Sequence, residues 1–359
     1  MIETKAVRTI TPYVSGPIAG TATYTTTTSP TQRAYNHEAR LDTSLLRTDL
    51  SGQQRPPATT AGPFARWSIR PPIGRQIRTV NSFAAGLPAA GGPNGWTVTG
   101  CPFPCERCGM DQPDVDIFSF AERPDLLARL DEFTDDTAAP FLYHDPVSVT
   151  LFRSLVDRLP EYTLVAVERA GGAPAGLIST LPYTPPPEGD LPPGGYDAVL
   201  LVAAADALAG RRGPLVAALF ATVAPGLRGT GLSEALLAAA GRNAAALGHA
   251  VLAVPVRPTR KHEHPDVPMA EYIAWRRPDG LPVDPWLRLH AQAGGTIVGV
   301  APHSMTITAP LDRWRRWTGL PFDESGPVRV PGALVPVLCD TDHDMAMYVE
   351  PNIWVTHAL

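Results

Sequence analysis

The segment between residues 223 and 233 has residue types and a spacing that suit the binding of a phosphate group. Gly229 and Gly231 allow close approach of the backbone and unusual φ angles. A turn of this kind presents successive N–H groups to an anion, and the N-terminus of a following helix adds its dipole. Arg228 supplies a positive charge suited to phosphate, and Ser233 can cap the helix or donate to the same anion. The segment therefore predicts an anion-binding turn.

Two well-known phosphate-binding motifs are excluded by the same stretch of sequence. No Gly-Lys-Ser/Thr follows the turn, as a Walker P-loop requires. The spacing also differs from the Gly-x-Gly-x-x-Gly of a dinucleotide-binding turn, and no acidic residue ends the next apolar run. The remaining alternative to an anion site is a tight glycine-rich turn that only joins a strand to a helix.

The elements on either side of the turn would hold it in place. Residues 215–223 are apolar and predict a buried strand, and residues 250–255 predict a second strand. Between them, residues 232–247 are rich in Ala and Leu and predict a helix that ends at Gly248. This order places the turn at the end of a sheet, beside the N-terminus of a helix.

The arrangement resembles the acyl-CoA-binding motif of the GNAT N-acyltransferase superfamily, whose pattern is Arg/Gln-x-x-Gly-x-Gly/Ala. Arg228 and Gly231 fill the first two fixed positions, and Ser233 replaces the final Gly/Ala. The resemblance covers roughly residues 114–310. It implies an α/β (α+β) fold with a mixed, mostly antiparallel central sheet flanked by helices.

The resemblance also implies a reaction. An acyl group, most simply acetyl, would pass from acetyl-CoA or another acyl-CoA to an amine of a small molecule by direct attack. The loop amides would hold the pyrophosphate of CoA, and the strand before them would bind the pantetheine arm. The cofactor-binding residues that it implies are Ala221, Val223, Arg228, Gly229, Thr230, Gly231, Leu232 and Ser233.

The expected catalytic residues depart from the pattern of the family. Members often carry a Glu on the strand before the loop as general base, but Phe220 and Ala221 occupy that region here. His262, Glu263 or His264 could replace the missing base, or the amine could lose its proton through water. Members also often place a Tyr four residues before a Gly on a later helix, where it protonates the leaving thiolate. His290 stands at that position and can do this work near neutral pH, unless it is a histidine satisfied within its helix.

An insertion over residues 256–284 is dense in polar groups and follows the strand that opens away from its neighbour in this family. Arg257 and Arg260 are expected to bind the acceptor, for example through a carboxylate, or the 3′-phosphate of CoA. Trp286 is expected to shape an aromatic wall of the acceptor pocket. The alternatives are a solvated polar loop for the insertion and a packing role for Trp286.

A cysteine cluster offers a rival chemistry. Cys101, Cys105 and Cys108 have the Cys-x₃-Cys-x₂-Cys spacing of radical SAM iron–sulfur sites, but the chain after them does not read as the barrel of those enzymes. A zinc site with a fourth ligand, or an inert segment, is also compatible with the spacing. His262 and His264 are too few ligands to define a metal site, so no metal is predicted.

Composition divides the 359 residues into two parts. Residues 1–109 hold 11 Lys and Arg against 5 Asp and Glu, are rich in Pro, Gly and Thr, and predict a mostly disordered basic extension. Whether this extension belongs to the native protein, or whether translation starts at Met110, is left open. Residues 110–359 carry a net charge of −11 and predict the acyltransferase domain with a C-terminal extension of the sheet. That negative charge makes nucleic acid an unlikely partner, except for a tRNA donor.

Other runs fill out the expected domain. In the whole chain, no apolar run reaches 18 residues and the start lacks the apolar segment of a signal peptide, so a soluble, cytoplasmic protein is expected.

Helices are expected over 124–133, 148–159 and 285–293. Strands are expected over 115–120, 162–168, 174–180, 296–300, 304–308 and 348–355.

Three alternatives to a free acyl-CoA-dependent transferase remain at this stage. The missing strand Glu favours a non-catalytic module that binds or senses acyl-CoA. The Arg-rich insertion would also suit an acyltransferase whose donor is a carrier protein or an aminoacyl-tRNA. The sequence does not determine the acceptor, the acyl chain length or the oligomeric state.

Overall fold

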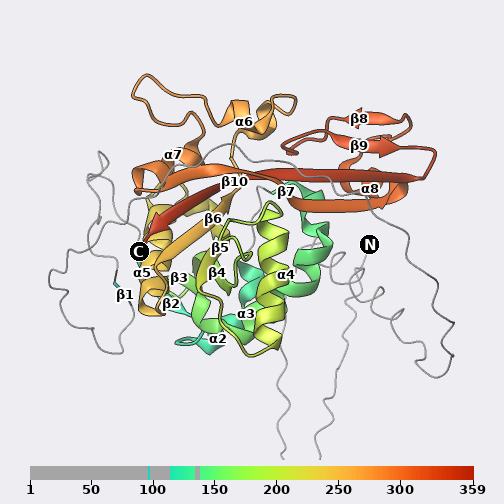
Figure 1. Ribbon diagram of the computed structural model, residues 1–359. Coiled ribbons are helices and arrows are strands. Elements are labelled where there is room, and N and C mark those ends of the chain that lie inside the picture. Colours follow the sequence, from blue (N-terminus) through green and yellow to red (C-terminus); the bar gives the residue numbers. More distant parts are fainter. Residues whose placement is uncertain (1–95, 98–113, 134–137) are drawn as a thin grey trace, which may run out of the picture. The chain divides into compact units, whose positions relative to one another are not determined.

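A computed structural model describes residues 96–97, 114–133 and 138–359 (Figure 1). All of them belong to one compact unit, Gly86–Leu359. The cysteines at 101, 105 and 108 lie outside the described residues, and so does nearly all of the extension expected over 1–109. Among the described helices, none combines the length and the apolar character needed to cross a membrane.

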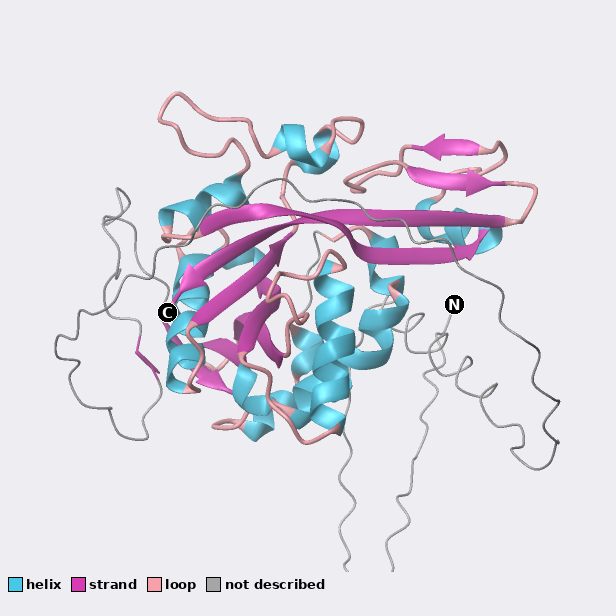
Figure 2. Cartoon of the chain, in the orientation of Figure 1, coloured by secondary structure: helices cyan, strands magenta, loops and turns pink. Residues whose placement is uncertain are grey.

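The centre of the fold is a ten-stranded sheet in the order β1-β2-β3-β4-β5-β6-β10-β9-β8, with β7 paired to β10 outside this path (Figure 2). Every pair of neighbours is antiparallel except β5 and β6. The expected mixed, mostly antiparallel sheet is therefore confirmed. The strands are β1 (Trp96–Thr97), β2 (Val115–Ser119), β3 (Thr163–Glu168), β4 (Pro174–Tyr183), β5 (Leu215–Val223), β6 (Val251–Val256), β7 (Thr296–Pro310), β8 (Gly326–Val328), β9 (Val337–Asp340) and β10 (Met345–Ala358).

The one parallel pair is short, and this is the feature that shapes the site. β5 and β6 pair only through Val216 with Leu252 and Ala217 with Ala253, and then part. On its other side β5 keeps its pairing with β4 as far as Val223. A register shift on that side leaves Leu219 as an extra residue in β5, a bulge that bends the strand. The last residues of β5 therefore have a sheet neighbour on one side only.

Helices cover both faces of the strands (Figure 1). α5 packs on β4 and β5, while α3 and α4 pack on each other and lie on the opposite side of the same strands. The helices are α2 (Pro124–Leu127), α3 (Pro146–Arg158), α4 (Gly195–Leu208), α5 (Leu232–Ala246), α6 (Met269–Tyr272), α7 (Pro285–Gln292) and α8 (Leu311–Thr318). The buried apolar residues form three clusters. The main one lies between the sheet and helices α3, α4 and α5, and two others surround Trp314 and Phe120.

Several elements differ from the sequence-based expectation. The helix expected over 124–133 is one turn, α2, followed by a 3₁₀ turn at Leu130–Glu132. The strands expected over 296–300 and 304–308 are one continuous strand, β7, because β10 pairs along its whole length. α4 has no counterpart in the sequence analysis; its apolar residues show no helical period because apolar side chains, Leu201 and Leu208 among them, also stand on its exposed face.

The close approach of α5 to the sheet depends on Gly176 in β4. A Cβ atom built on Gly176 would lie 2.8 Å from the Thr222 carbonyl oxygen and 3.0 Å from Cδ1 of Leu236. Gly176 also pairs with Val223, the last residue of β5. The glycine thus lets the helix and the end of β5 lie against the same point of β4.

We expect Gly176→Ala to lower the free energy of unfolding by about 1–3 kcal/mol, because the added methyl group meets a backbone oxygen that cannot move freely. Urea unfolding followed by circular dichroism measures this change. Gly299→Ala in β7 is the matched control, since its added Cβ has open space around it, and its stability should stay within about 0.5 kcal/mol of the parent. Equal stability of the two variants would contradict the packing argument.

Candidate active site

The predicted anion-binding turn lies at the end of β5, at the N-terminus of α5. A 3₁₀ turn at Pro225–Leu227 leads into Gly229 and Gly231, whose φ angles are +78° and +90°. Gly231 is the N-cap of α5. It has no side chain that could accept a hydrogen bond, so the first N–H groups of this 15-residue helix have no capping side chain. The geometry is that of an anion site, since N–H groups and the positive end of the helix dipole point to one place.

The side chains of the turn are bound back onto its own backbone. Arg228 Nε donates to the Val223 carbonyl at 3.3 Å, and Thr230 Oγ1 donates to the Leu227 carbonyl at 2.6 Å. Added Cβ atoms on Gly226 and Gly229 would meet nothing within 4 Å, so the outer side of the turn is open. Because Gly231 is the N-cap, the capping role suggested for Ser233 is wrong; its contact with an anion stays a prediction.

The open edge of β5 leads from this turn toward the middle of the sheet. Ala221 is exposed, and Leu219 and Phe220 are half-buried, although β5 is an interior strand of the sheet. Their exposure follows from the departure of β6 after Ala217. An extended, amide-bearing chain such as the pantetheine arm of CoA fits beside such a strand, because the unpaired edge offers it backbone hydrogen bonds.

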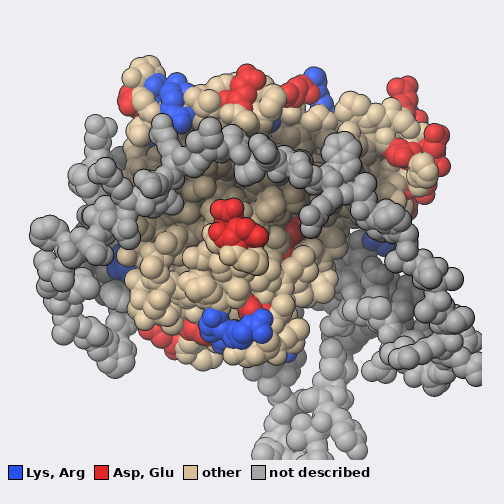
Figure 3. Space-filling view, in the orientation of Figure 1, with Lys and Arg blue, Asp and Glu red and all other residues tan. Residues whose placement is uncertain are grey.

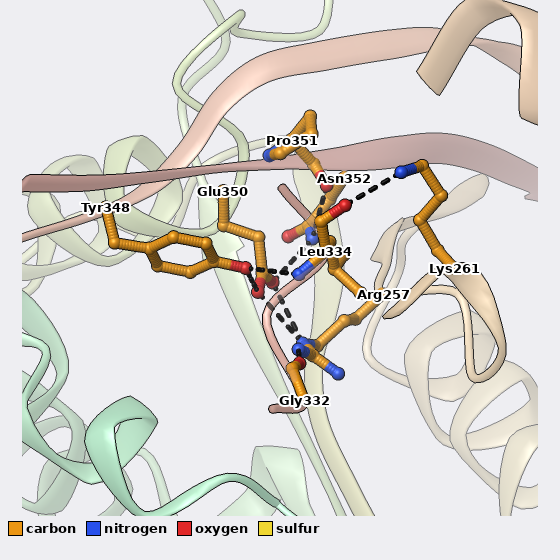
Figure 4. Close-up of polar contacts among 8 residues, drawn as sticks. All are labelled: Arg257, Lys261, Gly332, Leu334, Tyr348, Glu350, Pro351 and Asn352. Carbon is orange, nitrogen blue, oxygen red and sulfur yellow. Dashed lines mark hydrogen bonds and ion pairs between the residues drawn. The ribbon is translucent and has the colours of Figure 1, made fainter. Parts of the chain in front are cut away.

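The insertion after β6 places Arg257 differently from the expectation. Its Nε lies 2.9 Å from Oε2 of the buried Glu350, and its Nη2 donates to the Gly332 carbonyl at 2.6 Å (Figure 4). Glu350 also accepts from the Tyr348 hydroxyl and from Asn352 Nδ2, at 2.6 and 2.9 Å. Arg257 therefore serves a carboxylate of the protein itself in this arrangement.

The other polar residues of the insertion have partners as well. Arg260 forms an exposed ion pair with Glu263, at 2.7 Å, which holds the pKa of Glu263 below its usual value. Lys261 is fully buried and donates from Nζ to the carbonyls of His264 and Leu334. His262 is exposed. No group of three or more His, Cys, Asp or Glu in the described ranges is arranged to hold a metal ion.

Asp284, which the sequence analysis did not single out, fixes this insertion in place. It caps α7 by accepting from the N–H groups of Trp286 and Leu287. It also accepts from the Arg260 N–H and from the Tyr272 hydroxyl, each at 2.9 Å. The pattern Asp-Pro at the start of a helix is a capping signal that could have identified it.

His290 is buried in α7 and paired with a second histidine. Its Nδ1 lies 2.9 Å from Nε2 of His357, and its own Nε2 has no hydrogen-bond partner among the described residues. Burial, and after it the nearby His357, lowers the pKa of His290 to about 3. His357 lies opposite Leu252, where β5 and β6 are still paired. Trp286 is half-buried, and its ring lies 4.9 Å from that of His290.

A pair of buried carboxyl groups lies near Glu350 and was missed from the sequence. Asp145 caps α3 and accepts from the Ser148 N–H at 2.7 Å, and Asp197 in the first turn of α4 accepts from the Thr306 N–H at 3.0 Å. Their two carboxyl groups face each other. Burial, and then the facing Asp145 and the nearby Glu350, raises the pKa of Asp197 to about 8. The only local signal is Asp-Pro before α3, which indicates a cap and not a site.

Comparison with known proteins supports an acyltransferase. No protein-family model matches the chain. The chain is 35% identical over 275 residues to the arginine N-acetyltransferase avaD of Aspergillus versicolor, and the match covers 69% of this chain and 95% of that protein.

Two solved structures resemble the chain at lower sequence identity. One is the loading GNATL domain of CurA from Lyngbya majuscula, at 17% identity and a TM-score of 0.44, covering 68% of this chain and 97% of that one. The other is an agmatine N-acetyltransferase, at 13% identity and a TM-score of 0.35, covering 68% of this chain and all of that one. The 35% identity to the relative from Aspergillus versicolor shows that the chain belongs to the GNAT superfamily of N-acyltransferases, which use an acyl-CoA as acyl donor.

Proposed function

We propose that this protein transfers the acetyl group of acetyl-CoA to a nitrogen of arginine or of an arginine-like acceptor. The observation that carries the proposal is the 35% identity to an arginine N-acetyltransferase across 95% of that protein. We also propose a cytoplasmic location, as expected from the sequence.

The donor would lie along the edge of β5 and across the turn. In this proposal the charge of Arg228 and the backbone N–H groups of Gly229, Gly231, Leu232 and Ser233 hold the pyrophosphate of CoA. The Thr230 N–H, which donates to the Leu227 carbonyl at 3.4 Å in the free protein, would turn to the phosphate on binding. Ala221 and Val223 bind the pantetheine arm through the open strand edge. The support is local geometry: an uncapped helix N-terminus, two glycines at positive φ, and a strand edge without a neighbour.

The reaction needs few steps from the protein. The acceptor nitrogen, as a free amine, forms a bond to the thioester carbonyl carbon; the C–S bond then breaks, the nitrogen loses one proton, and the CoA thiolate takes up one. A backbone N–H of β5 directed at the carbonyl oxygen would stabilise the negative charge that develops there. Holding donor and acceptor in line supplies much of the remaining rate.

The proton-transfer roles expected for His262, Glu263 and His290 stay predictions. The ion pair with Arg260 makes Glu263 a weaker base, and the ring of His290 is neutral at pH 7 because its pKa is lowered. For His290 to protonate the thiolate as an imidazolium, the pair with His357 would first have to take up a proton. We place Arg260 and Trp286 near the acceptor entrance, and Arg257 as the group that positions Glu350.

The first experiment is a transfer assay with the full chain. Acetyl-CoA is incubated with L-arginine, agmatine or L-lysine, and mass spectrometry detects a product heavier by one acetyl group, with release of free CoA thiol. We expect acetylated arginine or agmatine. CoA binding without transfer to any amine would overturn the proposal in favour of a sensing module. No binding of free CoA would overturn it in favour of a carrier-protein or aminoacyl-tRNA donor.

We expect Arg228→Glu to raise the dissociation constant for CoA by about 10- to 100-fold, because a charge-assisted contact is replaced by repulsion. Isothermal titration with CoA measures the change. Arg313→Glu, on the exposed surface of α8, reverses one charge elsewhere and should leave the constant within about twofold. Similar affinities for both variants would place the phosphates away from this turn.

Protonation of His290 should be visible in the pH dependence of stability. Its pKa is about 3 in the folded chain and near 6.5 when unfolded, so its neutral form stabilises the fold above pH 6.5. That stabilisation is lost as the pH falls from 6.5 toward 3, by about 1.4 kcal/mol for each pH unit.

In His290→Gln the free energy of unfolding should therefore fall less steeply between pH 6.5 and 4.5 than in the parent. His262→Gln, which removes an exposed histidine, is the control and should keep the parent slope. Urea unfolding at a series of pH values gives both slopes. An unchanged slope in His290→Gln would mean that the ring is not held neutral.

A further inference from the structure

Asp145 and Asp197 form a buried acidic pair that no basic side chain of the described residues neutralises. Asp145 has an exposed fraction of 0% and Asp197 of 9%. The Oδ1 atom of each is buried and receives no hydrogen bond from any donor in the described part of the chain. Neither carboxyl group forms an ion pair with a Lys or Arg of the described residues, whereas the neighbouring Glu350 has Arg257. Buried charges ordinarily have such a partner, because their desolvation is costly.

The pair lies on the acceptor side of the parted strands. Glu350, whose charge acts on both aspartates, is held by Arg257, and Arg257 directly follows the last residue of β6. This is the end of β6 that has separated from β5. The aspartates come from α3 and α4, which cover the face opposite to α5 and its turn (Figure 1). A molecule bound at the pair would therefore approach the open strands from the face opposite to the proposed phosphate site.

The surroundings of the pair favour a cation. In Figure 3, Asp and Glu atoms stand near the centre of the face, on the rim below its shaded hollow. The proline-rich loop before α4 adds two exposed acids, Glu188 and Asp190. That loop is fixed to the sheet, since the Pro192 carbonyl accepts from Trp354 Nε1 at 2.9 Å. The pair is faced by Glu350, Tyr348 and Arg257. The guanidinium of Arg257 is bound to Glu350, so it does not serve as a counter-ion for Asp145 and Asp197.

We propose that Asp145 and Asp197 bind the guanidinium group of the acceptor, and so present its amino group to the thioester. The inference rests on the proposed function for the identity of the acceptor. A planar guanidinium has five N–H donors, which suit two facing carboxylates, and it stays charged when buried. In the free protein the pKa of Asp197, raised to about 8 by burial and then by Asp145, keeps this carboxyl group protonated at pH 7, and that proton takes the place of the cation.

Binding must then displace that proton. The guanidinium arrives with its positive charge, the proton of Asp197 leaves to the buffer, and both carboxyl groups become carboxylates. A cation held by two buried carboxylates is the arrangement that offsets their desolvation. A neutral ureido group of the same shape, as in L-citrulline, cannot displace the proton in this way.

The test measures binding and turnover separately. Isothermal titration of the full chain with agmatine, in two buffers of different ionisation enthalpy at pH 7, should show release of a proton on binding. L-citrulline should bind at least tenfold more weakly than L-arginine. In Asp197→Asn and in Asp145→Asn, KM for L-arginine should rise at least tenfold, while the dissociation constant for CoA stays within twofold.

Asp206→Asn is the matched control. Asp206 is a second buried carboxylate of α4, with an exposed fraction of 2%, but it already has the Arg211 guanidinium and the Thr184 N–H as partners. This variant should lose stability and keep the parent KM for L-arginine. Asp197→Glu keeps the charge and should retain more of the arginine affinity than Asp197→Asn.

Failure of the inference and failure of the proposed function have different signatures. If the parent acetylates arginine and Asp197→Asn keeps its KM, the function stands and the cation site is wrong. If the parent acetylates neither arginine nor agmatine, yet binds agmatine with proton release that is lost in Asp197→Asn, the site stands and the proposed acceptor is wrong. Equal binding of citrulline and arginine would overturn the site by itself.

Discussion

The short pairing between β5 and β6 is the constraint on which the rest of the structure depends. Two parallel strands side by side form a continuous ladder unless something separates them, and here the ladder stops after Ala217 and Ala253. β4 holds β5 on one side and β10 holds β6 on the other, so the two strands are drawn apart inside an otherwise continuous sheet. The opening therefore needs no loop or lid, since it follows from which neighbour each strand keeps.

In the proposed reaction this opening separates a donor face from an acceptor face. On one face, Gly176 lets α5 lie close to β4, and the N-terminus of α5 meets the end of β5. On the other, α3 and α4 bring two carboxyl groups beside β7, where Asp197 accepts from the Thr306 N–H. A direct transfer requires both substrates at one carbonyl carbon at the same time, and an approach from opposite faces allows this without a covalent intermediate on the enzyme.

Much of the fold could be predicted from the sequence because its signals are local. The strand ending at Val223 and the helix starting at Leu232 have the bounds that hydrophobic runs and glycines indicated. α4 could not be predicted, since its exposed face carries Leu201 and Leu208 and therefore gives the helix no polar side and no period. The helix predicted over 124–133 was too long, because the spacing of Leu residues does not show which of them are buried against the core; in α2 only Leu126 is buried.

For the site, the glycines, the arginine and the helix start between residues 228 and 233 were enough to predict an anion-binding turn, because these signals lie close together in the chain. The sequence by itself also placed His290 on its helix. Only the tertiary structure decided which charged groups have partners. Arg257 meets Glu350, and Asp145 meets Asp197, across long stretches of chain, and burial then sets their protonation. The physical reason is that desolvation and charge pairing depend on neighbours in space, which the order of residues alone does not specify.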